Sequence, residues 1–330
     1  MAELLSLVDL FTLYIRRSFT KAGLTKQSVS VDSQTVIHFW CTKPEVRDVR
    51  KPSLLFIHGF GPVSLWQWQY QVHSSIPYCF LSTPSSLFSK PIVLMRTRKV
   101  PFFAPHFNVF VPDLVFFGES TTISWERSEI FQAESLAKLL EKLAVERCSV
   151  VGTSYGGFVA YHMAKKYPDK VDCVVIASSG INMKRNLHKE IGVEKISDLL
   201  LPQTASQVRK LFGTVVSWRL SVLPDFILND FISKMYNNRN HKLELLEGLT
   251  LGRDDSPSIS TLHQKVLLIW GEKDKIFPVE MAWELQRLLG ETVKLAIVKN
   301  SSHTPQIQNP SQFNNLVKDF LLTSSQRSLL

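Results

Sequence analysis

Residues 152–157, Gly152-Thr153-Ser154-Tyr155-Gly156-Gly157, decide the fold of this 330-residue chain. An apolar run rich in β-branched residues precedes them, and small and apolar residues recur at helical spacing after them. The stretch therefore predicts a strand, a sharp turn that carries Ser154, and a helix, which is the layout of a nucleophile elbow. Gly152 and Gly156 allow the close backbone approach that such a turn needs. The alternative for so short a pattern is an ordinary glycine-rich turn with a solvated serine.

Units of a buried strand followed by a helix recur on both sides of this stretch. Continuous apolar runs, typical of strands covered on both faces, occupy 53–57, 109–111, 148–151, 171–177, 266–270 and 293–298. Helical periodicity is clearest over 128–144, 279–289 and 310–322. This alternation predicts an α/β fold, with a mostly parallel sheet and helices on both of its faces.

Segments that break the alternation set the predicted domain organisation. Residues 1–28 are predicted to hold an N-terminal amphipathic helix, and residues 29–178 and 262–330 to form the two parts of the core. Residues 179–261 lose the alternation and carry scattered apolar anchors, so they are predicted to form a helical cap between the core parts. The core begins with an antiparallel strand pair over 29–42.

The N-terminal helix is expected over residues 4–19, where apolar residues recur on one face and Arg16, Arg17 and Lys21 close it. We expect this apolar face to pack on the body of the protein. The alternative is peripheral contact with a membrane, because an apolar face followed by cations suits the interface of a bilayer. No run of 18 or more uninterrupted apolar residues occurs, so a membrane-spanning helix is not expected.

The segment 72–99 does not fit the core. Serine, proline and threonine cluster in its 28 residues, and it has neither an acidic residue nor a sustained period. It is predicted to be an irregular insertion, which is uncommon inside an α/β unit. Valine codons begin with GT and a lysine codon can end in AG, so removal in frame could join Gln71 to Val100. A retained intron is one explanation of the segment, and a genuine surface loop is the other.

A serine hydroxyl is a weak nucleophile and needs a base, commonly a histidine held by a carboxylate. His303 follows the last predicted strand and Asp274 follows the strand before it, so both are expected at the carboxyl edge of the sheet. The order Ser154, Asp274, His303 is the one expected when this chemistry lies on such a sheet. The backbone N–H groups of Phe60 and Tyr155 are predicted to form the oxyanion hole.

Five other residues are weaker candidates for this chemistry. Asp113 also follows a strand but would place the acid before the serine, and Asp172 lies at the starting edge of its strand. Glu272 is a lesser alternative as the carboxylate. His162 is expected on the helix behind the serine, packed or solvated, and His58 is expected to be a buried structural residue.

The composition limits which binding partners and which cellular compartment are expected. The net charge of +9 includes four cations within 72–99, and the other basic residues form no basic helix or aromatic-interleaved stripe, so nucleic-acid binding is not expected. The four cysteines lack metal-binding spacing, which predicts a reducing compartment with no disulfide framework and no zinc site. The N-terminus lacks the features of a secretory signal, so a cytoplasmic location is expected.

Five short motifs together resemble the α/β-hydrolase superfamily, and within it a plant branch similar to monoacylglycerol lipases and epoxide hydrolases. They are His58-Gly59-Phe60-Gly61, Val111-Pro112-Asp113-Leu114 with Gly118, Gly152 to Gly157, Gly271-Glu272-Lys273-Asp274 through Pro278, and Ser302-His303-Thr304-Pro305 through Pro310. The resemblance implies an eight-stranded sheet with the cap inserted after the sixth strand. Epoxide hydrolases of this fold use an aspartate nucleophile, so Ser154 favours ester chemistry.

The function expected from these residues is hydrolysis of a carboxylic ester through an acyl-enzyme. Apolar residues in the cap indicate a lipophilic ester, similar to a monoacylglycerol, and no metal or organic cofactor is expected. Two alternatives use the same residues. One is a ligand receptor or scaffold in which turnover is slow or absent, and the other is carbon–carbon bond hydrolysis or a lyase reaction.

Overall fold

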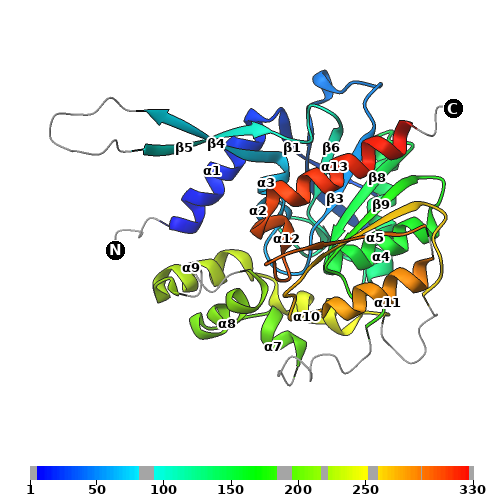
Figure 1. Ribbon diagram of the computed structural model, residues 1–330. Coiled ribbons are helices and arrows are strands. Elements are labelled where there is room, and N and C mark those ends of the chain that lie inside the picture. Colours follow the sequence, from blue (N-terminus) through cyan, green and yellow to red (C-terminus); the bar gives the residue numbers. More distant parts are fainter. Residues whose placement is uncertain are drawn as a thin grey trace.

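The computed structural model describes residues 6–81, 93–183, 195–216, 222–251, 259–290 and 292–326, and of segments 73–100 and 325–326 only the backbone. Among the described residues, the main sheet has the strand order β1-β2-β6-β3-β8-β9-β10-β11, and a short β7 pairs with β2 (Figure 1). The strands are β1 Leu24–Ser30, β2 Thr35–Thr42, β3 Ser53–Ile57, β6 Asn108–Pro112, β7 Thr121–Thr122, β8 Cys148–Thr153, β9 Val171–Ala177, β10 Lys265–Gly271 and β11 Lys294–Val298. The eight strands from β1 to β11 agree with the predicted eight-stranded sheet.

The sheet is mostly parallel, as the sequence predicted. Six neighbouring strands are parallel to one another: β6, β3, β8, β9, β10 and β11. Strand β2 runs in the opposite direction and is antiparallel to both β1 and β6. Successive side chains of a strand point to opposite faces, and here both faces are covered, which explains the continuous apolar runs. Leu55 and Ile57 of β3 therefore join one core cluster, while Leu54 and Phe56 join the other.

Helices cover both faces. On one lie α4 Glu129–Lys142, α5 Tyr155–Lys166 and α11 Val279–Leu289, and on the other α1 Leu7–Lys21, α2 Ser64–Gln67, α3 Gln69–Val72 and α13 Pro310–Gln326. The predicted helix 128–144 is α4, whose first turn is capped by the Ser128 hydroxyl accepting the Phe131 N–H. A 3-10 turn η1 Pro44–Val46 and the short α12 Pro305–Gln308 complete these connections.

Helices of the predicted cap lie between β9 and β10 (Figure 1, green to yellow). They are α7 Ile196–Leu200, α8 Ala205–Val215, α9 Asp225–Met235 and α10 Arg239–Glu247. Their buried residues, among them Val208, Leu228 and Leu245, belong to the same core cluster as α4 and α5. Residues 184–194, 217–221 and 252–258 of the predicted cap lie outside the described residues.

Glu129 fastens the chain that leaves the cap to the core. Its fully buried carboxylate accepts the N–H groups of Thr250 and Leu251 at 3.0 Å and the Thr250 hydroxyl at 2.5 Å. Burial acts to raise the pKa of Glu129, but hydrogen bonds from His162 and Thr250 lower it below its usual value. An ionised carboxylate thus serves as the hydrogen-bond acceptor for three donors in the loop that follows the cap.

The N-terminal boundary differs from the prediction. Helix α1 continues to Lys21 and β1 begins at Leu24, so residue 28, the predicted end of the N-terminal helical segment, lies inside a strand. Pairing with β2 extends β1 beyond its alternating part, because backbone hydrogen bonds do not depend on the side-chain pattern. As expected, α1 packs on the body, burying Val8, Ile15 and Phe19.

The irregular structure predicted for 72–99 is wrong for the part that the structure describes. Strands β4 His73–Leu81 and β5 Val93–Pro101 pair antiparallel in a separate two-stranded sheet, and Figure 1 shows this hairpin projecting away from the body. Strand pairing satisfies the backbone without requiring a repeating side-chain pattern, so the lack of a period did not reveal it. Residues 82–92 of the segment lie outside the described residues.

The two ends of this hairpin meet where it leaves the body. The Val72 carbonyl accepts the Phe102 N–H at 3.3 Å, and His73 lies opposite Pro101. Paired residues of this kind have Cα atoms about 5.5 Å apart, a span that one intervening residue can bridge. A chain lacking 72–99 would place Val100 at the buried position of Val72 and leave Pro101 as that single link.

We therefore expect the chain without residues 72–99 to fold, with a free energy of unfolding within about 2 kcal/mol of that of the full chain, because no core side chain type is lost. Urea denaturation followed by tryptophan fluorescence measures this difference. Loss of a cooperative transition in the shortened chain would show that the hairpin is part of the folding unit. Sequencing cloned transcripts tests the intron hypothesis separately.

Candidate active site

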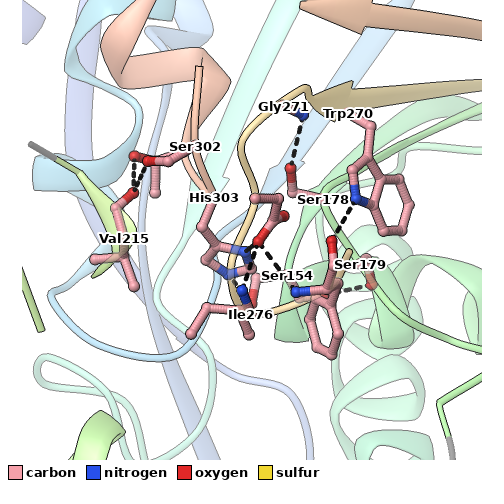
Figure 2. A network of polar contacts seen from close by, with 12 residues as sticks. Ser154, Ser178, Ser179, Val215, Trp270, Gly271, Ile276, Ser302 and His303 are labelled. Carbon is pink, nitrogen blue, oxygen red and sulfur yellow. Dashed lines mark hydrogen bonds and ion pairs between the residues drawn. The ribbon is translucent and has the colours of Figure 1, made fainter. Parts of the chain in front are cut away.

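The three residues predicted to work together lie together at the carboxyl edge of the sheet (Figure 2). Ser154 follows β8, Asp274 follows β10 and His303 follows β11. The Ser154 Oγ is 2.9 Å from His303 Nε2, and His303 Nδ1 is 3.1 and 3.0 Å from the two Asp274 oxygens. His303 and Asp274 are buried, so little water competes for these contacts. The geometry is that of a serine linked through a histidine to a carboxylate.

The Asp274 carboxylate is held by backbone groups as well as by the histidine. Its Oδ1 accepts the N–H groups of Ile276 at 2.9 Å and Phe277 at 3.0 Å. The Phe277 carbonyl in turn accepts the indole N–H of Trp270 at 2.8 Å. Two backbone N–H groups thus fix the carboxylate, which can keep the histidine in one orientation.

The Ser154 backbone adopts the conformation of a nucleophile elbow, with φ 51° and ψ −122°. A side chain on Gly156 would collide with the carbonyls of Ile57 and His58, and one on Gly152 would collide with Gly156 itself. The strained conformation is held by the Ser154 N–H, which donates to the Ala177 carbonyl, and by the Ser179 hydroxyl, which donates to the Ser154 carbonyl. An ordinary turn with a solvated serine is therefore excluded.

The predicted oxyanion donors lie on either side of the serine. The backbone N–H groups of Phe60 and Tyr155 have no hydrogen-bond acceptor among the described residues. The loop carrying Phe60 passes close to Ser154, since a Cβ on Gly59 would lie 3.1 Å from the Ser154 Cβ. Two free N–H groups beside a serine Oγ can receive the negative charge of a tetrahedral intermediate.

Gln67 of α2 holds the oxyanion loop, and the sequence reasoning missed it. Its Oε1 accepts the Gly59 N–H at 2.9 Å, and its Nε2 donates to the carbonyls of Gly59 at 2.9 Å and Pro62 at 2.5 Å. A buried side-chain amide thus holds both polar backbone groups of Gly59, the residue before Phe60. In the sequence, only the position of Gln67 a few residues after a glycine-rich loop could have suggested this role.

His58 has the structural role that was predicted. Its buried ring accepts the Leu114 N–H at Nε2, 3.0 Å away, and its Nδ1 lies 2.8 Å from the Gly59 carbonyl. Burial lowers the pKa of His58 to about 4. The ring is therefore neutral at neutral pH and ties the oxyanion loop to the segment after β6.

The weaker candidates lie apart from His303. The half-buried Asp113 accepts the Ser64 N–H, and desolvation raises its pKa to about 6. Asp172 pairs with Arg147, and Glu272 accepts the Asn300 N–H. His162 lies 3.5 Å from Glu129 behind the serine, with its side chain 15% exposed, so it is packed.

The loop that carries His303 is bound to the cap (Figure 2). The hydroxyls of Ser302 and Thr304, one on each side of the histidine, both donate to the Val215 carbonyl at 3.1 and 2.7 Å. Val215 is the last residue of α8, where helical carbonyls lack internal partners. The position of the base is therefore coupled to the position of a cap helix.

A buried lysine of the cap, Lys242 of α10, lies behind the oxyanion loop. Its Nζ donates to the Met235 carbonyl at 2.9 Å and sits 5.2 Å from the centre of the Phe117 ring. The Phe117 ring packs edge-on against His58 and Phe60. Burial lowers the pKa of Lys242 to about 8. Nothing in the sequence indicated that Lys242 is buried, because lysine is a hydrophilic residue.

Metal sites and reactive thiols would be other sources of chemistry in the part of the chain that the structure describes. No group of three or more His, Cys, Asp or Glu side chains there could hold a metal ion. Cys41, Cys148 and Cys173 are buried free thiols, and burial raises the pKa of Cys148 to about 12, which leaves it unreactive. None of the described helices combines the length and hydrophobicity needed to cross a bilayer.

Replacing Gln67 by Met is expected to slow covalent labelling of Ser154 by a fluorophosphonate by about tenfold or more, because an oxyanion donor that loses its orientation stabilises charge poorly. The second-order labelling rate measures this. Gln69→Met is the matched control, since Gln69 is equally buried but bonds only to the Trp66 carbonyl. Equal rates for the two variants would remove Gln67 from the site.

The pKa of Lys242 predicts a pH-dependent stability. Between about pH 8 and its unfolded value near 10.5, the unfolded chain holds a proton that the folded chain has released, so burial of Lys242 costs less as the pH rises. The free energy of unfolding of the wild type minus that of Lys242→Met should therefore rise by about 3 kcal/mol across this window. Urea denaturation at several pH values tests this, and a constant difference would contradict it.

With this geometry established, comparison with known proteins shows what the chain is similar to. Among curated proteins it is 24% identical to 2-hydroxy-6-oxo-6-phenylhexa-2,4-dienoate hydrolase of Burkholderia cepacia over 228 residues, which cover 67% of this chain and 79% of that protein. A solved protein of Acinetobacter baumannii, described as a candidate lipase, superimposes with a TM-score of 0.74 at 19% identity, covering 99% of this chain and all of the other.

A second solved structure, the carboxylesterase CesB of Bacillus subtilis, has a TM-score of 0.66 at 16% identity and covers 94% of this chain and 98% of its own. These relatives are carbon–carbon bond hydrolases, lipases and esterases, and none of them distinguishes the plant branch that the motifs resemble. The family model described as the alpha/beta hydrolase fold matches residues 52–233, just over half of the chain. The chain therefore belongs to the α/β hydrolase fold family.

Proposed function

We propose that this protein is a serine hydrolase that cleaves carboxylic esters with a lipophilic group. The observation that carries the proposal is the contact of Ser154 Oγ with His303 Nε2 at 2.9 Å, beside two N–H groups that have no acceptor among the residues that the structure describes. Ser154 attacks the ester carbonyl while His303 takes its proton, and the N–H groups of Phe60 and Tyr155 hold the oxyanion. The alcohol leaves with the proton from His303, and an acyl-enzyme remains.

Water completes the reaction. His303 removes a proton from a water molecule, which attacks the acyl carbonyl, and Ser154 recovers its proton when the acid leaves. Asp274, fixed by two backbone N–H groups, stabilises the charged histidine in both steps. Both steps of this reaction use only groups of this chain and a water molecule.

Aromatic rings around the triad support a lipophilic substrate. The Phe277 ring lies 5.6 Å from the His303 ring, and Phe158 packs against Phe277 at 6.1 Å. The Tyr155 ring lies 6.2 Å from the Phe158 ring and 5.8 Å from the Phe60 ring. Such surroundings favour an acyl or alkyl group over a strongly hydrated one.

Hydrolysis of a carbon–carbon bond is the second candidate, and the similarity to the dienoate hydrolase of Burkholderia cepacia favours it. The same serine, histidine and oxyanion donors serve either reaction, so the site geometry does not separate them. The difference lies in the substrate, because the relative's name specifies a dienoate that carries a carboxylate.

Purified wild type and Ser154→Ala are compared on p-nitrophenyl esters of increasing acyl length and on 2-hydroxy-6-oxo-6-phenylhexa-2,4-dienoate. We expect labelling of the wild type alone by a fluorophosphonate, and multiple turnover on esters of medium or long acyl chains with at least about 10³-fold less activity in Ser154→Ala. Faster consumption of the dienoate than of any ester would favour carbon–carbon hydrolysis. Labelling without turnover would favour a receptor, and no labelling would overturn the proposed nucleophile.

A further inference from the structure

Helix α1 has two apolar faces, although a helix packed on a globular body needs only one. The inner face buries Val8, Ile15 and Phe19 against the body. The outer stripe consists of residues spaced i, i+3, i+4 and i+7 that are 39–49% exposed: Leu7, Leu10, Phe11 and Tyr14. Packing on the core therefore accounts for the inner face and leaves the outer stripe at the surface.

Cap helix α9 lies on the same side of the molecule as α1 and contacts it (Figure 1). Asp230 of α9 accepts the Ser6 hydroxyl at 2.7 Å, and Lys234 pairs with Asp9 at 2.6 Å. Phe226, four residues before Asp230 on α9, is 60% exposed. These polar contacts hold α1 and α9 together.

Cations occupy the other end of the outer stripe. Arg17 and Lys21 stand ten and fourteen positions after Leu7, which places them on the same face of α1, and both are exposed. The nearest acidic residue of the helix, Asp9, is off this face and paired with Lys234. One helix face therefore combines an apolar half with a cationic half, in a chain of net charge +9.

We propose that the outer stripe of α1 binds the surface of bilayers that contain anionic phospholipids. Leucine and aromatic side chains enter the boundary between headgroups and acyl chains, while the long stems of Arg17 and Lys21 carry their charges to lipid phosphates. A fluid bilayer can surround side chains that project from a convex helix, whereas a folded partner needs a matching groove. This binding does not depend on the reaction catalysed at Ser154.

The test is sedimentation of the full chain with phosphatidylcholine vesicles, with and without 30% phosphatidylserine. The wild type should bind the anionic vesicles, and Leu7→Gln with Leu10→Gln should weaken this binding about tenfold. Arg17→Gln with Lys21→Gln should weaken binding to anionic vesicles by a similar factor and leave binding to neutral vesicles unchanged. The matched control is Trp283→Gln with Leu288→Gln, which removes two comparably exposed residues of helix α11 and should bind as the wild type does.

Three results would overturn the proposal. The first is a wild type that fails to sediment with anionic vesicles. The second is equal loss of binding in the α1 and α11 variants, which would indicate nonspecific adsorption. The third is a wild-type dimer in analytical ultracentrifugation that Leu7→Gln with Leu10→Gln converts to a monomer, which would make the stripe an interface between two copies of the chain. Circular dichroism confirms that each variant is folded.

Discussion

The close passage of three backbone segments at the nucleophile elbow is the constraint on which the rest of the structure depends. Gly156 lies so close to the carbonyls of Ile57 and His58 that a side chain at this position would collide with them. Helix α5 therefore begins directly against the end of β3, and the oxyanion loop that leaves β3 is brought beside Ser154. The strain at Ser154 persists because Ala177, the last residue of β9, and Ser179, just after it, hold it from the other side.

Parallel strands turn this local constraint into a complete site. Strands β3, β8, β10 and β11 all end at the same edge, so the oxyanion loop, the serine, the carboxylate and the histidine come from four separate loops of one rigid sheet. Each loop is then held by its own hydrogen bonds, as Asp274 is by the N–H groups of Ile276 and Phe277. Rigid strands set the coarse positions, and short-range polar contacts set the orientations.

Buried polar groups fasten the cap to this edge. Glu129 holds the chain that leaves the cap, and the Val215 carbonyl of α8 receives both hydroxyls that flank His303. Lys242 of α10 places its Nζ 5.2 Å from the centre of the Phe117 ring. Burying such groups costs free energy unless each finds a partner, so these contacts favour one arrangement of cap and core over other compact packings. The coupling makes the position of helix α8 part of the geometry around His303.

The sequence by itself determined the elements whose signals are local. The glycines around Ser154, the apolar strands and the loops after them were enough to predict the parallel sheet, the order Ser154, Asp274, His303 and the structural role of His58. Tertiary structure decided what depends on partners far away in the chain. The hairpin of β4 and β5 and the early start of β1 arise from backbone pairing, which leaves no side-chain pattern. Gln67, Lys242 and Ser302 are polar residues whose roles come only from the loop, ring or helix end that folding brings to them.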